Sequence, residues 1–164
     1  PILNLLIIGG MKKYVTLSVL SAVIIIAIAS FTFTNRKDSS STGADSGIEF
    51  FEGTWQQVLD KAKKEKKLVF VDAYTVWCGP CKYMSNAVFT DKAVGEYYNK
   101  NFVNYKFDME KGEGPQFASK YKITAYPTLL FINGDGEVVY RTMGARDADG
   151  FIKLGEEALV ANKK

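Results

Sequence analysis

The chain of 164 residues contains no histidine. This absence removes the side chain that serves most often as a general base near neutral pH, as a metal ligand and as a pH switch. It also excludes covalent haem attachment of the C-x-x-C-H type, because Lys82 stands where that motif has its histidine. No metal site is expected either, since two cysteines alone cannot supply the four Cys or His ligands of a closed zinc site.

An excess of one charge is also missing. The chain has 21 basic and 18 acidic residues, a formal net charge of +3, and two of the basic residues, Lys12 and Lys13, lie in the N-terminal segment. The remainder is close to neutral, whereas a nucleic-acid-binding domain usually carries a strongly basic face. No nucleic-acid partner is therefore expected. The lysine-rich run over residues 61–67 is interpreted as the solvent-exposed side of a helix.

An apolar stretch near the N-terminus has the features of a targeting segment. Residues 11–13, Met-Lys-Lys, precede an apolar run over residues 15–29 that ends in Ala-Ile-Ala. A charged start, an apolar run and small residues at the end are typical of a secretory signal. The run is also close to the ~20 residues that a membrane span needs. Residues 11–29 are therefore predicted to be a signal peptide or a membrane anchor, and both place the domain in the periplasm or another extracytoplasmic compartment. Residues 1–10 are interpreted as upstream sequence or an expression scar.

The remaining chain divides into a linker and a domain. Residues 30–47 are predicted to be a flexible linker, because Ser, Thr, Gly and Asp dominate from Asn35 onward and little apolar surface is available for burial. Residues 48–164 are predicted to form a single α/β domain.

The domain alternates helical and extended patterns. Thr54 and Gln57 form a capping-box signature at the start of the first helix. Strands that alternate with helices imply parallel pairing in an α/β sandwich, and a final hairpin through the Asn-Gly-Asp-Gly turn at residues 133–136 makes the sheet mixed. Helices are predicted over residues 55–66, 82–88, 91–100, 115–121 and 147–162, strands over 68–74, 102–108, 128–132 and 137–143, and an edge strand near 49–51.

The two cysteines are separated by Gly79 and Pro80. Where a C-x-x-C pair enters a helix, the sulfurs lie one turn apart, and the first sulfur lies at the helix N-terminus, where free N–H groups stabilise a thiolate. Thiolate is the species that attacks a disulfide. Cys78 is therefore predicted to be the exposed nucleophile and Cys81 the less exposed resolving thiol. Gly79 is expected to permit a tight turn and Pro80 to suit the first helical turn.

Three local features have competing interpretations. The cysteines of an exported protein commonly form a structural disulfide, but a bridge across two residues constrains the unfolded chain little, which favours a redox role. Asp72 interrupts an apolar strand six residues before Cys78. Burial would raise the pKa of its carboxyl group, as a proton relay to the Cys81 sulfur requires; the alternative is a solvated, inert Asp at a strand edge. Pro127 precedes a predicted strand, and on sequence alone a trans bond is the expectation.

Residues 77–82, Trp-Cys-Gly-Pro-Cys-Lys, resemble the active site of thioredoxin. Asp72 stands where thioredoxins have a buried acid, residues 126–128 resemble their cis-proline loop, and Gly144 falls where they have a Gly-Ala pair near the substrate groove. The resemblance covers roughly residues 50–160. It identifies the chain as a member of the thioredoxin superfamily and implies the thioredoxin fold, with a mixed central sheet flanked by helices.

A narrower resemblance comes from the stretch that follows the cysteines. Cys81-Lys82, residues 88–91 and Phe102-Val103 have a layout similar to the C-terminal domain of membrane thiol–disulfide interchange reductases and to related exported thioredoxin-like proteins. The Gly-Pro pair between the cysteines is instead typical of reducing thioredoxins.

The resemblance also implies roles for further residues. Pro127 would be cis and face the cysteines, and Tyr126 would offer main-chain N–H and C=O groups to an extended substrate. Gly144 would belong to the same substrate-binding surface. Trp77 and Tyr74 would flank the site, although large aromatic side chains can equally belong to a core. Trp77, Gly79, Pro80 and Lys82 would together support the active site.

The expected function is a thiol–disulfide oxidoreductase that reduces disulfides of exported client proteins. It would act as a monomer, with no cofactor beyond the redox-active Cys78–Cys81 pair. A membrane electron donor is a further expected partner, and membrane contact is expected only through an uncleaved N-terminal segment. A disulfide oxidase or isomerase on the same fold, and a peptide-binding module, are the alternatives.

Overall fold

The structure is a computed structural model that describes residues 47–163. The expectations for residues 1–10 and 11–29, and for nearly all of the linker, lie outside the described residues. Within residues 47–163 no helix is both long enough and apolar enough to cross a membrane.

Four strands form one mixed sheet in the order β2-β1-β3-β4. The strands are β1 (Leu68–Tyr74), β2 (Phe102–Asp108), β3 (Thr128–Ile132) and β4 (Val138–Met143). β1 pairs parallel with β2 and antiparallel with β3, and β3 pairs antiparallel with β4. The sequence prediction of a mixed sheet is therefore confirmed, and the predicted spans of β1, β2 and β3 agree with the structure.

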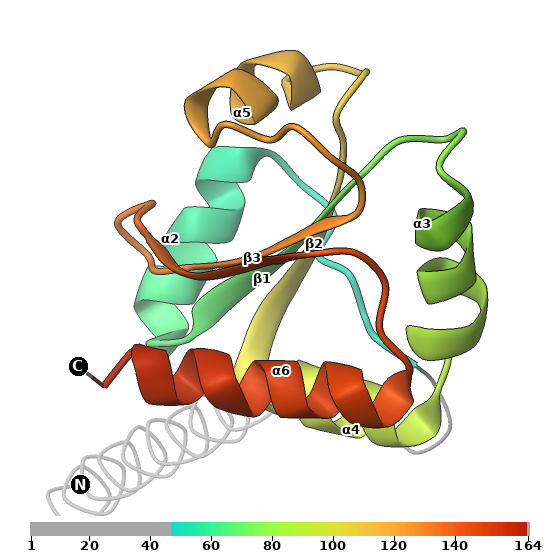
Figure 1. Ribbon diagram of the computed structural model, residues 1–164. Coiled ribbons are helices and arrows are strands. Elements are labelled where there is room, and N and C mark those ends of the chain that lie inside the picture. Colours follow the sequence, from blue (N-terminus) through green and yellow to red (C-terminus); the bar gives the residue numbers. More distant parts are fainter. Residues whose placement is uncertain (1–46, 164) are drawn as a thin grey trace, which may run out of the picture. The chain divides into compact units, whose positions relative to one another are not determined.

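Helices cover both faces of the sheet (Figure 1). The apolar side chains of the helices over residues 55–65 and 114–120 pack on one face of the sheet, and those of the helical stretches over residues 84–88, 92–101 and 148–161 pack on the other. The sheet and its two helical layers make the thioredoxin fold. The helices are α2 (Trp55–Glu65), α3 (Gly79–Tyr83), its π-helical continuation η1 (Met84–Val88), α4 (Lys92–Asn101), α5 (Gly114–Lys120) and α6 (Ala148–Ala161).

Local capping fixes where three of these helices begin. The predicted capping box of α2 is present, with Thr54 N–H donating to Gln57 Oε1 at 2.8 Å and Gln57 N–H donating to Thr54 Oγ1 at 3.3 Å. The Asp91 carboxylate accepts from Val94 N–H and caps α4, and Asp147 caps α6 in the same way. Each cap satisfies an N–H group that the helix itself leaves unpaired.

The central strand β1 sends alternate side chains to opposite faces, as any strand must. Val69, Val71 and Ala73 enter the core under α2 and α5. Leu68 and Phe70 enter the core under η1, α4 and α6. Asp72 lies two residues after Phe70, so its side chain is on the same face of the sheet. The helical stretch that follows the cysteines covers this face.

The predicted edge strand near residues 49–51 is reduced to a single parallel bridge between Phe50 and Asn104. Phe51 N–H donates to Asn104 O at 2.8 Å, which fixes this bridge. Ile48 N–H donates to Phe89 O at 2.7 Å instead, so the chain is drawn away from β2 just before the bridge. The prediction of an edge strand is therefore wrong in extent, because a competing hydrogen bond ends the ladder.

Candidate active site

The two cysteines lie just beyond the carboxyl end of β1 and form a disulfide, with an S–S distance of 2.03 Å. Cys78 is the N-cap residue of α3, and the backbone N–H of Cys81 donates to Cys78 Sγ at 3.1 Å. The helix begins at Gly79, three residues before its predicted start, and continues through η1. The first sulfur thus lies where unpaired N–H groups favour a negative charge.

Neither cysteine is exposed in this disulfide form. Cys78 is 4% exposed and Cys81 is 2% exposed. The expectation of an exposed Cys78 is therefore wrong here, because its sulfur is turned into the first helical turn, against Cys81. The exposed residues are its neighbours: Trp77, which is 64% exposed, together with Gly79 and Pro80.

Gly79 does not make the tight turn that the sequence suggested. It is the first residue of α3, its φ is outside the left-handed region, and a Cβ added there would meet no atom within 4 Å. The backbone therefore does not require glycine at this position. What the glycine does is leave open space beside Cys78. Pro80 lies in the first turn of α3, where its missing N–H costs nothing, as predicted.

Asp72 is completely buried, so the solvated alternative is wrong. Neither of its carboxylate oxygens has a hydrogen-bond partner among residues 47–163. Burial raises the pKa of this carboxyl group to about 6, and the nearby Lys106 ammonium opposes that rise. Asp72 is therefore a buried acid that changes charge close to neutral pH.

Lys106 is a functional candidate that the sequence analysis missed. It is paired with Asp72 in the β1–β2 register, and its Nζ lies 3.6 Å from Asp72 Oδ2. The same Nζ donates to Ser85 Oγ at 2.5 Å, on η1. No local pattern identifies Lys106, because only the register of two strands distant in sequence brings it to Asp72.

Trp77 lies against Tyr126, with ring centroids 5.8 Å apart in an edge-on arrangement. Trp77 Nε1 donates to Glu110 Oε1 at 2.9 Å, a partner that the sequence analysis did not find. These contacts bring the loop before β3 next to the residue that precedes Cys78. Tyr74 is half-buried at the end of β1, where its ring contacts the Lys106 ammonium.

The peptide bond between Tyr126 and Pro127 is cis. Pro127 is buried, and its carbonyl oxygen accepts a hydrogen bond from Gly144 N–H at 2.9 Å. Gly144 has φ +86°, a conformation that glycine adopts without strain. The substrate-binding candidates Tyr126, Pro127 and Gly144 are therefore contiguous, and Tyr126 joins them to Trp77. Lys82 is exposed on α3.

A disulfide between two cysteines at a helix N-terminus, with a buried acid on the strand beneath that helix, is an arrangement suited to thiol–disulfide exchange. The chain belongs to the thioredoxin-like domain family, which matches residues 55–159. Thioredoxin Y1 of Arabidopsis thaliana, a chloroplast protein, is 36% identical over 112 residues, covering 68% of this chain. The chain spans 62% of the length of that relative.

Two solved structures extend the comparison. A proposed disulphide isomerase from Bacteroides thetaiotaomicron is 52% identical, with a TM-score of 0.63, over 70% of this chain and 94% of that one. The oxidised C-terminal domain of DsbD from Neisseria meningitidis is 24% identical, with a TM-score of 0.56, over 67% of this chain and 99% of that one. The second likeness shows a shared fold, which confirms the predicted resemblance at that level.

Proposed function

We propose that this protein reduces disulfides of exported client proteins. The Cys78 thiolate attacks a client disulfide, forms a mixed disulfide and releases one client sulfur as a thiolate. Cys81 then loses its proton and attacks Cys78 Sγ, which frees the second client thiolate and leaves the Cys78–Cys81 disulfide. Two electrons pass to the client, so a separate dithiol donor must reduce the pair again.

Asp72 supplies the base for the second step. Its carboxyl group, with a pKa raised by burial to about 6, is largely ionised at pH 7 and is still a stronger base than a solvated carboxylate. It lies on the sheet face that the helix of Cys81 covers. Asp72 would therefore take the Cys81 proton as Cys81 attacks and return it to solvent afterwards.

One observation carries the proposed direction of electron flow. Within the described chain the Cys78 sulfur accepts a single hydrogen bond, from a neutral backbone N–H. No Lys or Arg donates to it there, and the sequence holds no histidine. Strong oxidants are oxidising because their reduced form is strongly stabilised. The helix N-terminus and one neutral N–H group would stabilise a Cys78 thiolate only in part, because no cationic side chain donates to this sulfur, and this supports the reductase.

The surface next to the pair suits an extended client segment. Trp77, Val76, Tyr83 and Met143 are exposed large apolar side chains, each 49% exposed or more. Tyr126 lies between Trp77 and Pro127, and within residues 47–163 its main chain forms no backbone hydrogen bond. A client strand could pair with Tyr126 while its apolar groups cover Trp77.

Export and the electron donor are further parts of the proposal. The charged and apolar N-terminal segment supports delivery to an extracytoplasmic compartment, as a cleaved or an anchored form. An oxidising compartment would require a membrane protein to supply electrons. Monomeric action is consistent with one complete Cys78–Cys81 site in one chain.

The reduction potential of the Cys78–Cys81 pair tests the direction. Equilibration with a reference dithiol should give a value near about −270 mV, as for thioredoxin, whereas about −120 to −180 mV would mark an oxidase or isomerase and overturn the reductase.

Isomerase activity is the second candidate, because the solved structure at 52% identity is a proposed disulphide isomerase. Refolding of a protein with scrambled disulfides distinguishes the two. An isomerase restores the activity of the scrambled protein without an added reductant. A reductase needs a continuing supply of electrons to act on that protein.

A further inference from the structure

The Lys106 ammonium lies close to a hydroxyl group, a carboxylate and three aromatic rings. Its Nζ donates to Ser85 Oγ at 2.5 Å, and the Asp72 carboxylate lies further away, at 3.6 Å. Three aromatic rings surround the same atom. The ring centroids of Tyr74, Phe89 and Phe50 lie 5.1, 5.2 and 5.4 Å from Nζ. Ser85 and these three rings are called the lysine cage below.

The cage competes with Asp72 for the ammonium. A distance of 3.6 Å is too long for a hydrogen bond, whereas 2.5 Å to Ser85 Oγ is a short one. Both Asp72 oxygens remain without a hydrogen-bond partner among the described residues. The aromatic faces attract the cation as well. The ammonium is thus held near the carboxylate but not on it.

Part of the cage comes from outside the region that matches the family. Phe50 belongs to the leading segment, residues 47–51, whereas the match begins at residue 55. The Phe50 ring also meets the Phe89 ring edge-on at 5.5 Å. The leading segment therefore contributes directly to the surroundings of a candidate catalytic acid.

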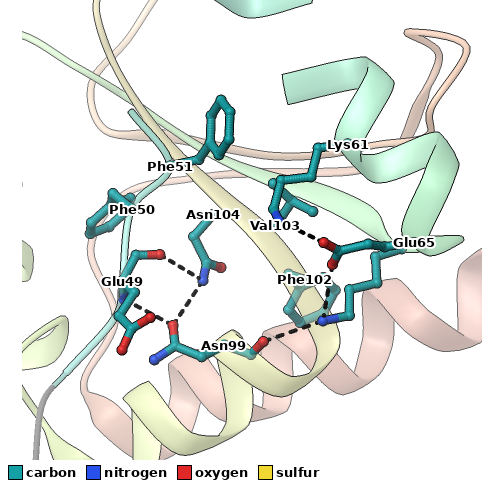
Figure 2. Close-up of a pocket in the computed structure, with 10 residues that line it drawn as sticks. Glu49, Phe50, Phe51, Lys61, Glu65, Asn99, Phe102, Val103 and Asn104 are labelled. Atoms are coloured by element: carbon teal, nitrogen blue, oxygen red, sulfur yellow. Dashed lines mark hydrogen bonds and ion pairs between the residues drawn. The ribbon is translucent and has the colours of Figure 1, made fainter. Parts of the chain in front are cut away.

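Polar contacts hold this leading segment in place (Figure 2). Asn99 Oδ1 accepts from Glu49 N–H at 2.9 Å and from Asn104 Nδ2 at 3.0 Å, and Asn104 Nδ2 also donates to Glu49 O at 3.3 Å. These bonds line a pocket of about 260 Å³ at the β2 edge. They fix the backbone before Phe50, and the Phe51 N–H bond to Asn104 O fixes it after Phe50, so the Phe50 ring is a defined wall of the cage.

We propose that Ser85 and Phe50 are positioning residues that hold the Lys106 ammonium off the Asp72 carboxylate. The consequence for turnover rests on the proposed function, in which Asp72 accepts the Cys81 proton. An ammonium bonded directly to Asp72 would make it a weaker base, because an opposite charge in contact favours the ionised carboxylate. The cage would thus preserve the basicity that the resolving step uses.

Few other charges act on Asp72. Lys106 is the charged group that influences it from β2, and its register partner on β3 is Leu129, which does not titrate. On its own strand Tyr74 has a pKa raised by burial, above its ordinary alkaline value, so it stays neutral over the range of interest. Cys81 does not titrate while it is bonded to Cys78. In the disulfide form Asp72 therefore titrates without a neighbouring thiol that titrates in the same pH range.

The test is a carboxyl ¹³C NMR titration of Asp72 in the oxidised full chain. In Ser85→Ala and Phe50→Leu the ammonium should approach Asp72, and the pKa of Asp72 should fall by about one unit, within the range for a close opposite charge. Ser85→Thr keeps the hydroxyl and should restore the wild-type value. Thr90→Ala is the matched control, because Thr90 Oγ1 donates to Asn86 O, which is outside the cage. An unchanged or higher pKa in both Ser85→Ala and Phe50→Leu would overturn the proposal.

Turnover measurements separate this proposal from the proposed function. In Ser85→Ala the low-pH midpoint of disulfide reduction should fall together with the pKa of Asp72, and the rate at pH 7 should drop about threefold because a weaker base transfers the proton less readily. If the NMR pKa falls while the pH–rate profile stays in place, the cage is supported and the relay role of Asp72 is refuted.

Discussion

The backbone N–H of Cys81 donates to the Sγ of Cys78, so the resolving residue itself stabilises the sulfur that it later attacks. This bond comes from the main chain and survives a change of the Cys81 side chain. Cys81→Ser should therefore keep a reactive Cys78 thiolate but lose the second attack.

Mixed disulfides with clients should accumulate in Cys81→Ser. Non-reducing gels of cells expressing this variant should show adducts that a reductant dissolves, and Cys78→Ser should show none. Adducts in Cys78→Ser and none in Cys81→Ser would mean that the attacking and resolving roles are reversed.

Asp72→Asn should change how stability depends on pH. The folded-state pKa of about 6 lies above the unfolded value near 3.8, so the folded state binds more protons between these values. The free energy of unfolding should then fall as pH rises through that window. The loss is up to about 3 kcal/mol above pH 6, at about 1.36 kcal/mol per pKa unit.

Urea denaturation of the oxidised proteins at pH 4, 5, 6 and 7.5 measures this dependence. As pH rises, the free energy of unfolding of the wild type should fall relative to that of Asp72→Asn, which has no carboxyl group at this position to titrate. Parallel curves for the two proteins would show that Asp72 has an ordinary pKa in the folded state.

Trp77→Ala should impair client binding without harming the fold. Trp77 is 64% exposed and contacts Tyr126 and Glu110 at the surface. We expect a change in unfolding free energy below about 1 kcal/mol, a severalfold higher KM for a protein disulfide, and an unchanged rate with a small disulfide. A KM that does not change for the protein substrate would exclude Trp77 from the binding surface.

The other tryptophan provides the matched control. Trp55 is half-buried and packs against four aromatic rings of the core, so Trp55→Ala should cost up to about 3–5 kcal/mol in thermal or urea unfolding. Its ring partners are Tyr105, Phe107, Phe117 and Tyr121.

Gly79→Ala should be tolerated by the fold. An added Cβ would meet no atom within 4 Å at this first helical position, and Ala is favoured over Gly in helices by up to about 1 kcal/mol. The melting temperature should stay the same or rise. At Gly114 the same change places a Cβ 2.0 Å from Asp108 O, so Gly114→Ala should lower it. A large loss in Gly79→Ala would show that the active-site turn does need glycine.

Much of the fold follows from the sequence because its signals are local. The apolar run of β1 and the β-rich runs of β2 and β3 predict the observed strands, and the capping pair Thr54 and Gln57 predicts the start of α2. The structure begins α3 at Gly79, three residues before the predicted helix, because its cap is the sulfur of Cys78 and not a usual Ser, Thr, Asp or Asn oxygen. The extent of pairing at residues 49–51 depended on the bond between Ile48 and Phe89, which the sequence does not show.

The sequence by itself determined the chemistry of the protein: a C-x-x-C pair ahead of a helix, an acid in an apolar strand, and no histidine to assist. Only the tertiary structure decided the surroundings of these groups. The approach of Lys106 to Asp72, its bond to Ser85 and the contact of Phe50 join segments that are distant along the chain. Strand register and helix packing set such contacts, and they depend on the whole core, so no short stretch of sequence encodes them.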